Sequence, residues 1–232
     1  MFHFKQFSVS HSESTMKVGT DAVLLGAWMP IPENCDNILD IGSGCGVISL
    51  MLAQRTEAMI TGIDMDKKSV KEAQKNAENS PWKERIHFFQ ENVQDFIQKT
   101  PQKFRLIITN PPFFENSLKS PKSKRNRSSH NDNLSFETLI SSVDMLLTEK
   151  GVFGIILPIN IVDKIKIITL EKRLYATKKT YIYPTPYKKP NRILIMFERE
   201  EKPCEKDQLV IRDNGYTDEY LLLVKEYLKI NN

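Results

Sequence analysis

Long apolar runs are missing from this 232-residue sequence, as are clustered cysteines and a strong charge of one sign. No apolar stretch approaches the roughly 18 residues that a membrane-spanning helix needs. The N-terminus, "MFHFKQFSVSHSES", is too polar after its first residues to be a signal peptide. We therefore expect a cytoplasmic protein that does not bind a membrane.

Neither the cysteines nor the histidines are spaced like the ligands of a metal or the partners of a disulfide framework. The three cysteines are Cys35, Cys45 and Cys204, and the four histidines are His3, His11, His87 and His130. Zinc sites and disulfide-rich domains repeat their cysteines at short, paired intervals, which does not happen here. We expect reduced thiols and no bound metal.

The composition is that of an ordinary globular protein, but the charge is unevenly distributed. Apolar residues make up 40% of the chain and charged residues 27%, which is enough for a sizeable core. The net charge is only +4, yet residues 117–192 contain 15 Lys and Arg against 6 Asp and Glu. This local excess favours an anionic partner, although a lysine-rich solvated surface produces the same pattern.

Short apolar runs alternate with helical stretches along most of the chain. The expected strands lie at 37–42, 58–64, 85–90, 104–109 and 152–158, and the expected helices at 47–55, 67–80, 135–151 and 217–230. This alternation predicts a doubly wound α/β sheet in a single domain spanning residues 1–232. Two further strands, 179–184 and 192–199, are joined by a connection too short for a parallel crossover, so we expect them to pair antiparallel.

A glycine-rich turn follows the first expected strand, in "LDIGSGCGVISL" (39–50). Its chemistry-bearing positions are Asp40, Gly42, Gly44 and Gly46. Glycines allow a sharp turn and a close approach of the backbone to a ligand. The carboxylate before the turn disfavours a pyrophosphate and favours a cationic amino-acid group. The spacing also differs from the G-x-G-x-x-G of dinucleotide sites, so an NAD-dependent oxidoreductase is the weakest interpretation.

The second expected strand ends in Asp64, where an acidic side chain can hold both ribose hydroxyls; a helix cap is the alternative role. Asp40, the glycines and Asp64 together resemble the S-adenosylmethionine site of class I methyltransferases. The resemblance implies a Rossmann-like fold with a seven-stranded, mostly parallel sheet whose last strand is antiparallel. It also implies that Asn92, with Val93 beside it, contacts the adenine of the cofactor, although Asn92 is also a plausible helix cap.

The fourth expected strand ends in "TNPPFF", residues 109–114. "NPPF" resembles the [DNS]-P-P-[FYW] signature of methyltransferases that act on exocyclic or amide nitrogens. An adenine amine is a poor nucleophile because its lone pair is delocalised into the ring. The Asn110 side-chain oxygen and the Pro111 carbonyl can each accept one of its N–H groups, Pro111 and Pro112 fix the backbone, and Phe113 can stack on the extruded base. The alternative is a tight turn plugged by aromatic side chains.

Four segments together resemble the bacterial tRNA1(Val) adenine N6-methyltransferase family over nearly the whole chain. They are "MKVGTDAVLLGAW" (16–28), "NPPFF", the loop carrying His130, and "NRILIMFERE" near the end. The resemblance implies N6-methylation of adenine 37, next to the anticodon of a valine tRNA, by a monomer that uses S-adenosylmethionine and no metal.

The same resemblance assigns roles to further residues. It places Lys17 and Thr20, within an N-terminal extension (1–36), near the methionine end of the cofactor. It also makes Asn110 a residue of the cofactor site. A basic loop (115–133) and one later arginine are candidates for RNA contacts: Lys119, Lys122, Lys124, Arg125, Arg127, His130 and Arg192. His130 could stack on RNA or, equally, cap the next helix. Phosphate contacts of this kind position a nucleic acid without reading its sequence.

Three alternatives remain at this stage. Other enzymes with an NPP[FY] motif methylate N2 of guanine in ribosomal RNA or N5 of glutamine in a protein. The basic balance of residues 117–192 favours an RNA over a protein substrate. A catalytically inactive RNA-binding Rossmann module would retain the fold, but it would not need to keep Asp40, Asp64 and Asn110.

Overall fold

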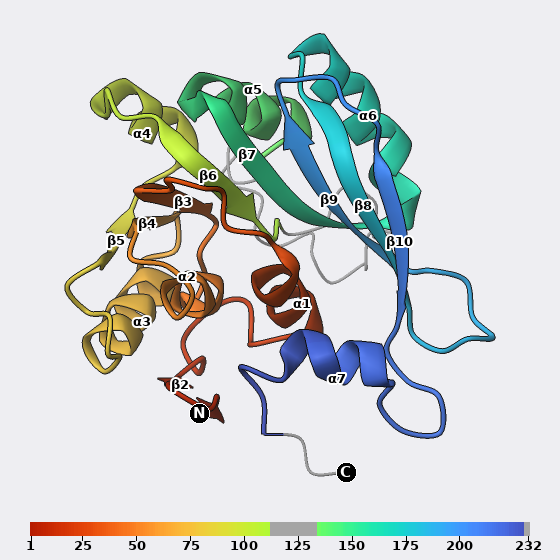
Figure 1. Ribbon diagram of the computed structural model, residues 1–232. Coiled ribbons are helices and arrows are strands. Elements are labelled where there is room, and N and C mark those ends of the chain that lie inside the picture. The colour runs from red at the N-terminus through yellow and green to blue at the C-terminus, as the bar shows by residue number, and fades with distance from the viewer. Residues whose placement is uncertain (112–133, 230–232) are drawn as a thin grey trace, which may run out of the picture.

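The computed structural model describes residues 1–111 and 134–229. Within them the central feature is an eight-stranded sheet in the order β10-β8-β9-β7-β6-β3-β4-β5 (Figure 1). Its strands are β3 (Asn37–Ile41), β4 (Met59–Asp64), β5 (Ile86–Gln90), β6 (Phe104–Thr109), β7 (Leu147–Pro158), β8 (Tyr175–Tyr183), β9 (Arg192–Glu198) and β10 (Glu205–Val210). A separate hairpin pairs β1 (Phe2–His3) with β2 (Ser8–Val9).

Strand direction follows the predicted pattern. The pairs β3–β4, β3–β6, β4–β5, β6–β7 and β10–β8 are parallel, whereas β9 is antiparallel to both of its neighbours, β7 and β8. The carboxyl ends of β3 to β6 therefore meet at one edge of the sheet, which is where open α/β sheets bind their ligands. The mostly parallel Rossmann-like class is confirmed.

Helices cover both faces of the sheet (Figure 1). One face carries α1 (Thr20–Trp28), α2 (Val47–Ala53), α3 (Lys67–Glu78) and α7 (Asp218–Val224). The other face carries α4 (Val93–Lys99), α5 (Phe136–Leu146) and α6 (Val162–Glu171), with a short 3-10 turn (Ile159–Ile161) before α6. Two apolar clusters, one under each helix layer, form the core. Because side chains alternate along a strand, Asp40 faces the α2 side together with Ile38, while Leu39 and Ile41 face the other.

Two details differ from the sequence-based expectation. The sheet has eight strands rather than seven, because the polar segment "EKDQLV" forms the edge strand β10, in which only Leu209 is buried. The helix expected to end at Gly151 ends at Leu146, and the chain passes directly into β7. Residues 148–151 are an irregularity in the pairing with β6, since Phe104 pairs with Leu147 and Leu106 with Val152. A Cβ on Gly151 would lie 2.7 Å from the Leu147 side chain, so a glycine suits this irregularity.

Candidate active site

The turn after β3 requires its glycines for two different reasons. Gly42, Gly44 and Gly46 all have positive φ angles, of 72°, 54° and 80°, which side-chain-bearing residues rarely adopt. A Cβ on Gly46 would also lie 2.6 Å from Cζ of Phe88, so this glycine lets α2 pack against the sheet. A Cβ on Gly42 or Gly44 would meet no described atom within 4 Å. These two glycines thus present bare backbone to open space, as a cradle for a ligand would.

Asp40 is a fully buried carboxylate directly before this turn. Its Oδ2 accepts a hydrogen bond of 2.7 Å from the Ser49 hydroxyl of α2, whereas its buried Oδ1 accepts none from the described residues. Burial raises the pKa of Asp40 to about 7; the Ser49 hydrogen bond lowers it and the nearby charge of Asp64 raises it. A buried acceptor without a donor is costly, and a cationic ligand group above the turn would relieve that cost.

Asp64 is held between two turns at the end of β4. Its Oδ2 accepts the N–H of Gly44 and its Oδ1 that of Asp66, both at 2.8 Å. Burial raises the pKa of Asp64, and the two N–H groups oppose that shift. The cap of α3 is Asp66, whose carboxylate accepts the Ser69 N–H. Asp64 is therefore not the helix cap, and its carboxylate is fixed beside the glycine turn.

The structure assigns Asn92 the capping role that the sequence left open. Its Oδ1 accepts the Asp95 N–H at 2.8 Å, and its Nδ2 donates to the Asp95 carboxylate at 2.6 Å. Val93 is the buried first residue of α4. Both lie just beyond the carboxyl end of β5, next to Asp64, which pairs with Gln90. An adenine contact by these two residues stays a prediction.

Asn110 follows β6 at the same edge. Thr109 pairs with Ile41 and its hydroxyl donates to the Ile41 carbonyl at 2.7 Å, which ties the ends of β6 and β3 together. Asn110 is half-buried, and its Oδ1 is inaccessible to solvent and accepts no hydrogen bond from the described residues. Pro111 is buried behind it. A second acceptor oxygen without a donor among the described residues thus lies at the end of β6, the strand next to that of Asp40.

Several predicted residues lie outside the part of the chain that the structure describes. They comprise the rest of the NPPF motif and the basic loop: Pro112, Phe113, Phe114, Lys119, Lys122, Lys124, Arg125, Arg127 and His130. Their roles in base stacking and RNA binding stay predictions.

The three remaining predicted residues come from the N-terminal segment and β9. The Lys17 ammonium donates to the Ser12 carbonyl at 2.7 Å, and Thr20 is the exposed first residue of α1. Arg192, a candidate RNA contact, forms an ion pair of 2.8 Å with Asp21 of α1. This pair joins the start of β9 to the start of α1, so Arg192 has a structural partner. Its contact with RNA stays a prediction.

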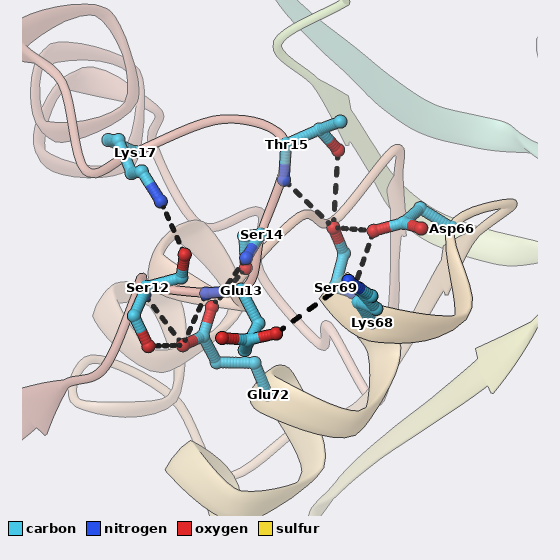
Figure 2. Close-up of polar contacts among 9 residues, drawn as sticks. All are labelled: Ser12, Glu13, Ser14, Thr15, Lys17, Asp66, Lys68, Ser69 and Glu72. Carbon is cyan, nitrogen blue, oxygen red and sulfur yellow. Dashed lines mark hydrogen bonds and ion pairs between the residues drawn. The ribbon is translucent and has the colours of Figure 1, made fainter.

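One part of this region is not apparent from the sequence. Residues 10–15 run along α3 and contact its side chains, chiefly the buried Glu72 (Figure 2). In the sequence, Glu72 looks like any charged residue of a solvated helix face. The one signal in the sequence is the serine-rich run "SHSES", whose N–H and hydroxyl groups can surround a carboxylate.

No helix in the described ranges is long and apolar enough to span a membrane. Among the same residues, no group of three or more His, Cys, Asp or Glu side chains is arranged to hold a metal ion. Burial raises the pKa values of the Cys35 and Cys45 thiols to about 11, so both stay protonated at neutral pH.

Comparison with known proteins agrees with this geometry. Residues 4–126 match the family model described as "Methyltransferase small domain". A tRNA1(Val) (adenine(37)-N6)-methyltransferase of Flavobacterium psychrophilum is 42% identical, with 99% of this chain and 100% of the relative covered. Proteins of the same name from Bacteroides fragilis and Proteus mirabilis are 40% and 37% identical, covering 99% and 97% of this chain and 98% and 92% of their own lengths.

Solved structures support the fold. A predicted O-methyltransferase from Agrobacterium tumefaciens superposes with a TM-score of 0.72 at 19% identity, covering 89% of this chain and 96% of that one. A ribosomal protein L11 methylase from Lactobacillus delbrueckii superposes with a TM-score of 0.55 at 16% identity, covering 78% and 77%. With full-length relatives at about 40% identity, the chain belongs to the tRNA1(Val) (adenine(37)-N6)-methyltransferase family.

Proposed function

We propose that this protein transfers a methyl group from S-adenosylmethionine to N6 of adenine 37 in tRNA1(Val). The observation that carries the proposal is a pair of buried acceptor oxygens at one sheet edge. Asp40 Oδ1, on β3, and Asn110 Oδ1, directly after the neighbouring strand β6, accept no hydrogen bond from described residues, and the glycine turn beside them is open. Buried acceptors that no described residue satisfies are suited to donors carried by ligands.

The cofactor side of the site consists of Asp40, Asp64 and the glycine turn. S-adenosylmethionine, when bound, supplies an electrophilic methyl group and a cationic amino-acid end. Asp40 attracts that cationic end, the open backbone at Gly42 and Gly44 admits the ligand closely, and Asp64 accepts the ribose hydroxyls. Asp64 is already oriented by two backbone N–H groups, so it loses little freedom when a ligand binds.

On the substrate side, Asn110 Oδ1 and the Pro111 carbonyl each accept one N–H of the adenine amine. This draws the nitrogen away from planarity and turns its lone pair toward the methyl donor. The nitrogen would gain the methyl group as the carbon–sulfur bond of the donor breaks, which leaves S-adenosylhomocysteine. The methylated nitrogen would then be positively charged and would lose one of its two protons to water. Because these acceptors are held in place before the reaction, they stabilise the developing positive charge without reorganising.

A tRNA substrate implies that the enzyme acts in the cytoplasm. We also propose that the protein works as a monomer with a single domain.

A direct test offers labelled S-adenosylmethionine with three kinds of acceptor: unmodified total tRNA, ribosomal RNA and a release factor. We expect label in tRNA alone. Label only in ribosomal RNA or only in the release factor would preserve the fold and cofactor but replace the substrate. No transfer to any acceptor, together with retained RNA binding, would favour the inactive RNA-binding module.

The β8–β9 loop, residues 184–191, is a second candidate surface for the tRNA. It follows the carboxyl end of β8 and returns to Arg192, which pairs with Pro158 at the carboxyl end of β7, so it projects from the same sheet edge as Asn110 (Figure 1). Tyr187 is 91% exposed, and Lys188 and Lys189 are exposed beside it. A shallow groove of about 460 Å³ adjoins this loop, lined by Tyr181, Tyr183, Lys206, Asp207 and Gln208. An exposed aromatic ring next to two cations suits base stacking and phosphate contact.

This surface can be tested through salt dependence. Replacing Lys188 and Lys189 by glutamine should lower the slope of log K against log salt concentration for tRNA binding by about 1 to 2. The matched control replaces Lys83 and Lys103, which precede β5 and β6 at the opposite edge, and should leave the slope unchanged. Equal slopes in both double variants would exclude this loop from the interface.

Tyr187→Ala should weaken tRNA binding about 10-fold by removing a stacking partner.

A further inference from the structure

We propose that Glu72 of α3 is a positioning residue, around which the segment 10–17 folds to form one wall of the cofactor site. This segment is called the N-terminal strap below. The inference deepens the proposed function and rests on it, since it concerns the same cofactor site. Both carboxylate oxygens of Glu72 are bound by the strap, so we assign Glu72 the role of holding the strap and not that of contacting the reacting atoms.

Both oxygens of the Glu72 carboxylate are surrounded by donors from the strap (Figure 2). Oε2 accepts the Ser14 N–H at 2.8 Å and the Ser14 hydroxyl at 2.5 Å. Oε1 accepts the Ser12 N–H at 2.7 Å and the Glu13 N–H at 3.2 Å, and it also accepts the hydroxyls of Ser10 and Ser12 at 3.1 and 3.2 Å. The strap thus encloses a carboxylate much as an anion-binding loop encloses a phosphate.

The negative charge of Glu72 is essential to this arrangement. The residue is 5% exposed, and no ion pair to it is found among the described residues, so N–H and O–H donors alone compensate the charge. Burial raises the pKa of Glu72, but the hydrogen bonds from Ser14, Glu13 and Ser10 outweigh burial and lower it to about 2. Charge-assisted hydrogen bonds of this kind are stronger than neutral ones. A glutamine at this position would point its amide N–H groups at the N–H and O–H donors of the strap. The conformation of the strap therefore depends on a carboxylate.

Other side chains on the same face of α3 connect the strap to both cofactor-binding turns. Asn76, one helical turn after Glu72, binds the Ser10 N–H and carbonyl at 2.8 Å each and donates to the Cys45 carbonyl in the glycine turn at 2.9 Å. At the other end, the Thr15 N–H donates to the Ser69 hydroxyl, which in turn donates to the α3 cap Asp66. The strap therefore extends from the glycine turn to the turn that orients Asp64.

The strap also holds Lys17, whose ammonium donates to the Ser12 carbonyl, and it leads directly into α1. Releasing the strap would move Lys17 and remove the hydrogen bonds that connect the strap to the two turns through α3, but it would leave Asp40, Asp64 and Asn110 in place. The expected consequence is weaker cofactor binding with little change in the chemical step. A purely structural anchor would instead change stability without changing the ratio of KM to kcat.

The test compares Glu72→Gln with Glu72→Asp and with Glu78→Gln, an exposed glutamate on the same helix. The measurements are Kd for S-adenosylhomocysteine by calorimetry, KM for S-adenosylmethionine, kcat at saturating cofactor, and Tm. For Glu72→Gln we expect Kd and KM to rise about 10-fold or more, with kcat within about 3-fold of the unmodified protein, because several hydrogen bonds to a charged acceptor are lost. Glu72→Asp should recover part of the affinity, and Glu78→Gln should change nothing.

A double variant, Ser12→Ala with Ser14→Ala, covers the case in which Glu72→Gln does not fold. It keeps the carboxylate and the backbone donors and removes two hydroxyls that contact Glu72. A rise of about 3-fold or more in Kd at an unchanged Tm would support the inference. Unchanged Kd in both variants, or a fall in Tm and kcat with Kd unaltered, would overturn it. Because S-adenosylhomocysteine binding needs no RNA, this result is independent of which nucleic acid is methylated.

Discussion

Asn110→Ala should lower kcat for methyl transfer by about 100- to 1000-fold, with Kd for S-adenosylhomocysteine within about 3-fold of the unmodified protein. The substitution removes one of two acceptors that draw the amine nitrogen out of conjugation. It leaves the glycine turn and Asp64 intact, and Oδ1 of Asn110 makes no hydrogen bond with the described residues that the fold would lose.

Two controls separate chemistry from structure. Asn79→Ala removes an exposed asparagine at the end of α3 and should behave like the unmodified protein. Asn110→Asp keeps an acceptor oxygen and should retain more activity than the alanine variant. Equal losses of catalysis and cofactor affinity in Asn110→Ala would show that Asn110 supports the site structurally instead of binding the target amine.

Asp40→Asn should abolish most cofactor binding, by about 100-fold or more, and should at the same time stabilise the protein without ligand at pH 8. The loss follows from removing the buried charge that attracts the cationic end of the ligand, since charge pairs in a buried site are strong. The gain in stability follows from the raised pKa of Asp40. At pH 8 the folded protein without ligand holds a buried charge, which is unfavourable, whereas the unfolded state exposes that charge to water.

The raised pKa of Asp40 makes the folding stability of the ligand-free protein depend on pH. Between about pH 4 and 7, folded Asp40 holds its proton whereas the unfolded side chain has lost it. Stability of the ligand-free protein therefore falls as the pH rises through this window. A shift from 3.8 to about 7 corresponds to at most about 4 kcal/mol at pH 8, and the asparagine variant should recover a part of it.

Ligand affinity should show the opposite trend. In the unmodified protein, affinity for S-adenosylhomocysteine should fall by up to about 10-fold per unit below pH 7, because protonating Asp40 removes its charge. The dependence should be absent in Asp40→Asn and kept in Asp36→Asn, an exposed aspartate just before β3. Thermal melts and calorimetry between pH 5 and 8 measure both effects. A destabilised Asp40→Asn variant with normal affinity would contradict this role.

The sequence predicts the parallel part of the fold and the glycine turn after β3 well because their signals are local. A glycine at a positive φ angle and an aspartate at a strand end are visible as single letters, and Gly42, Gly44 and Asp64 lie where they were expected. The sequence alone does not decide between the alternative roles of Asn92 and Arg192. Only the bonds to Asp95 show that Asn92 caps α4, and only the ion pair with Asp21 shows that Arg192 is tied to α1.

Features that depend on contacts between distant segments escaped prediction. The strand β10 is polar because one of its sides faces solvent at the sheet edge, so "EKDQLV" lacks the apolar pattern of a core strand. Glu72 is buried only because a segment some sixty residues earlier in the chain folds over it, as its bond to the Ser12 N–H shows. A charged letter in a helix does not reveal such a partner.

The central claim is that the adenine at position 37 of one valine tRNA is the acceptor. The most direct measurement uses purified protein, labelled S-adenosylmethionine and two unmodified tRNA1(Val) transcripts, one with adenine and one with guanine at position 37, followed by nucleoside analysis. The account predicts N6-methyladenosine from the adenine transcript and no label in the guanine transcript. Equal label in both transcripts, or a methylated nucleoside other than N6-methyladenosine, would contradict it.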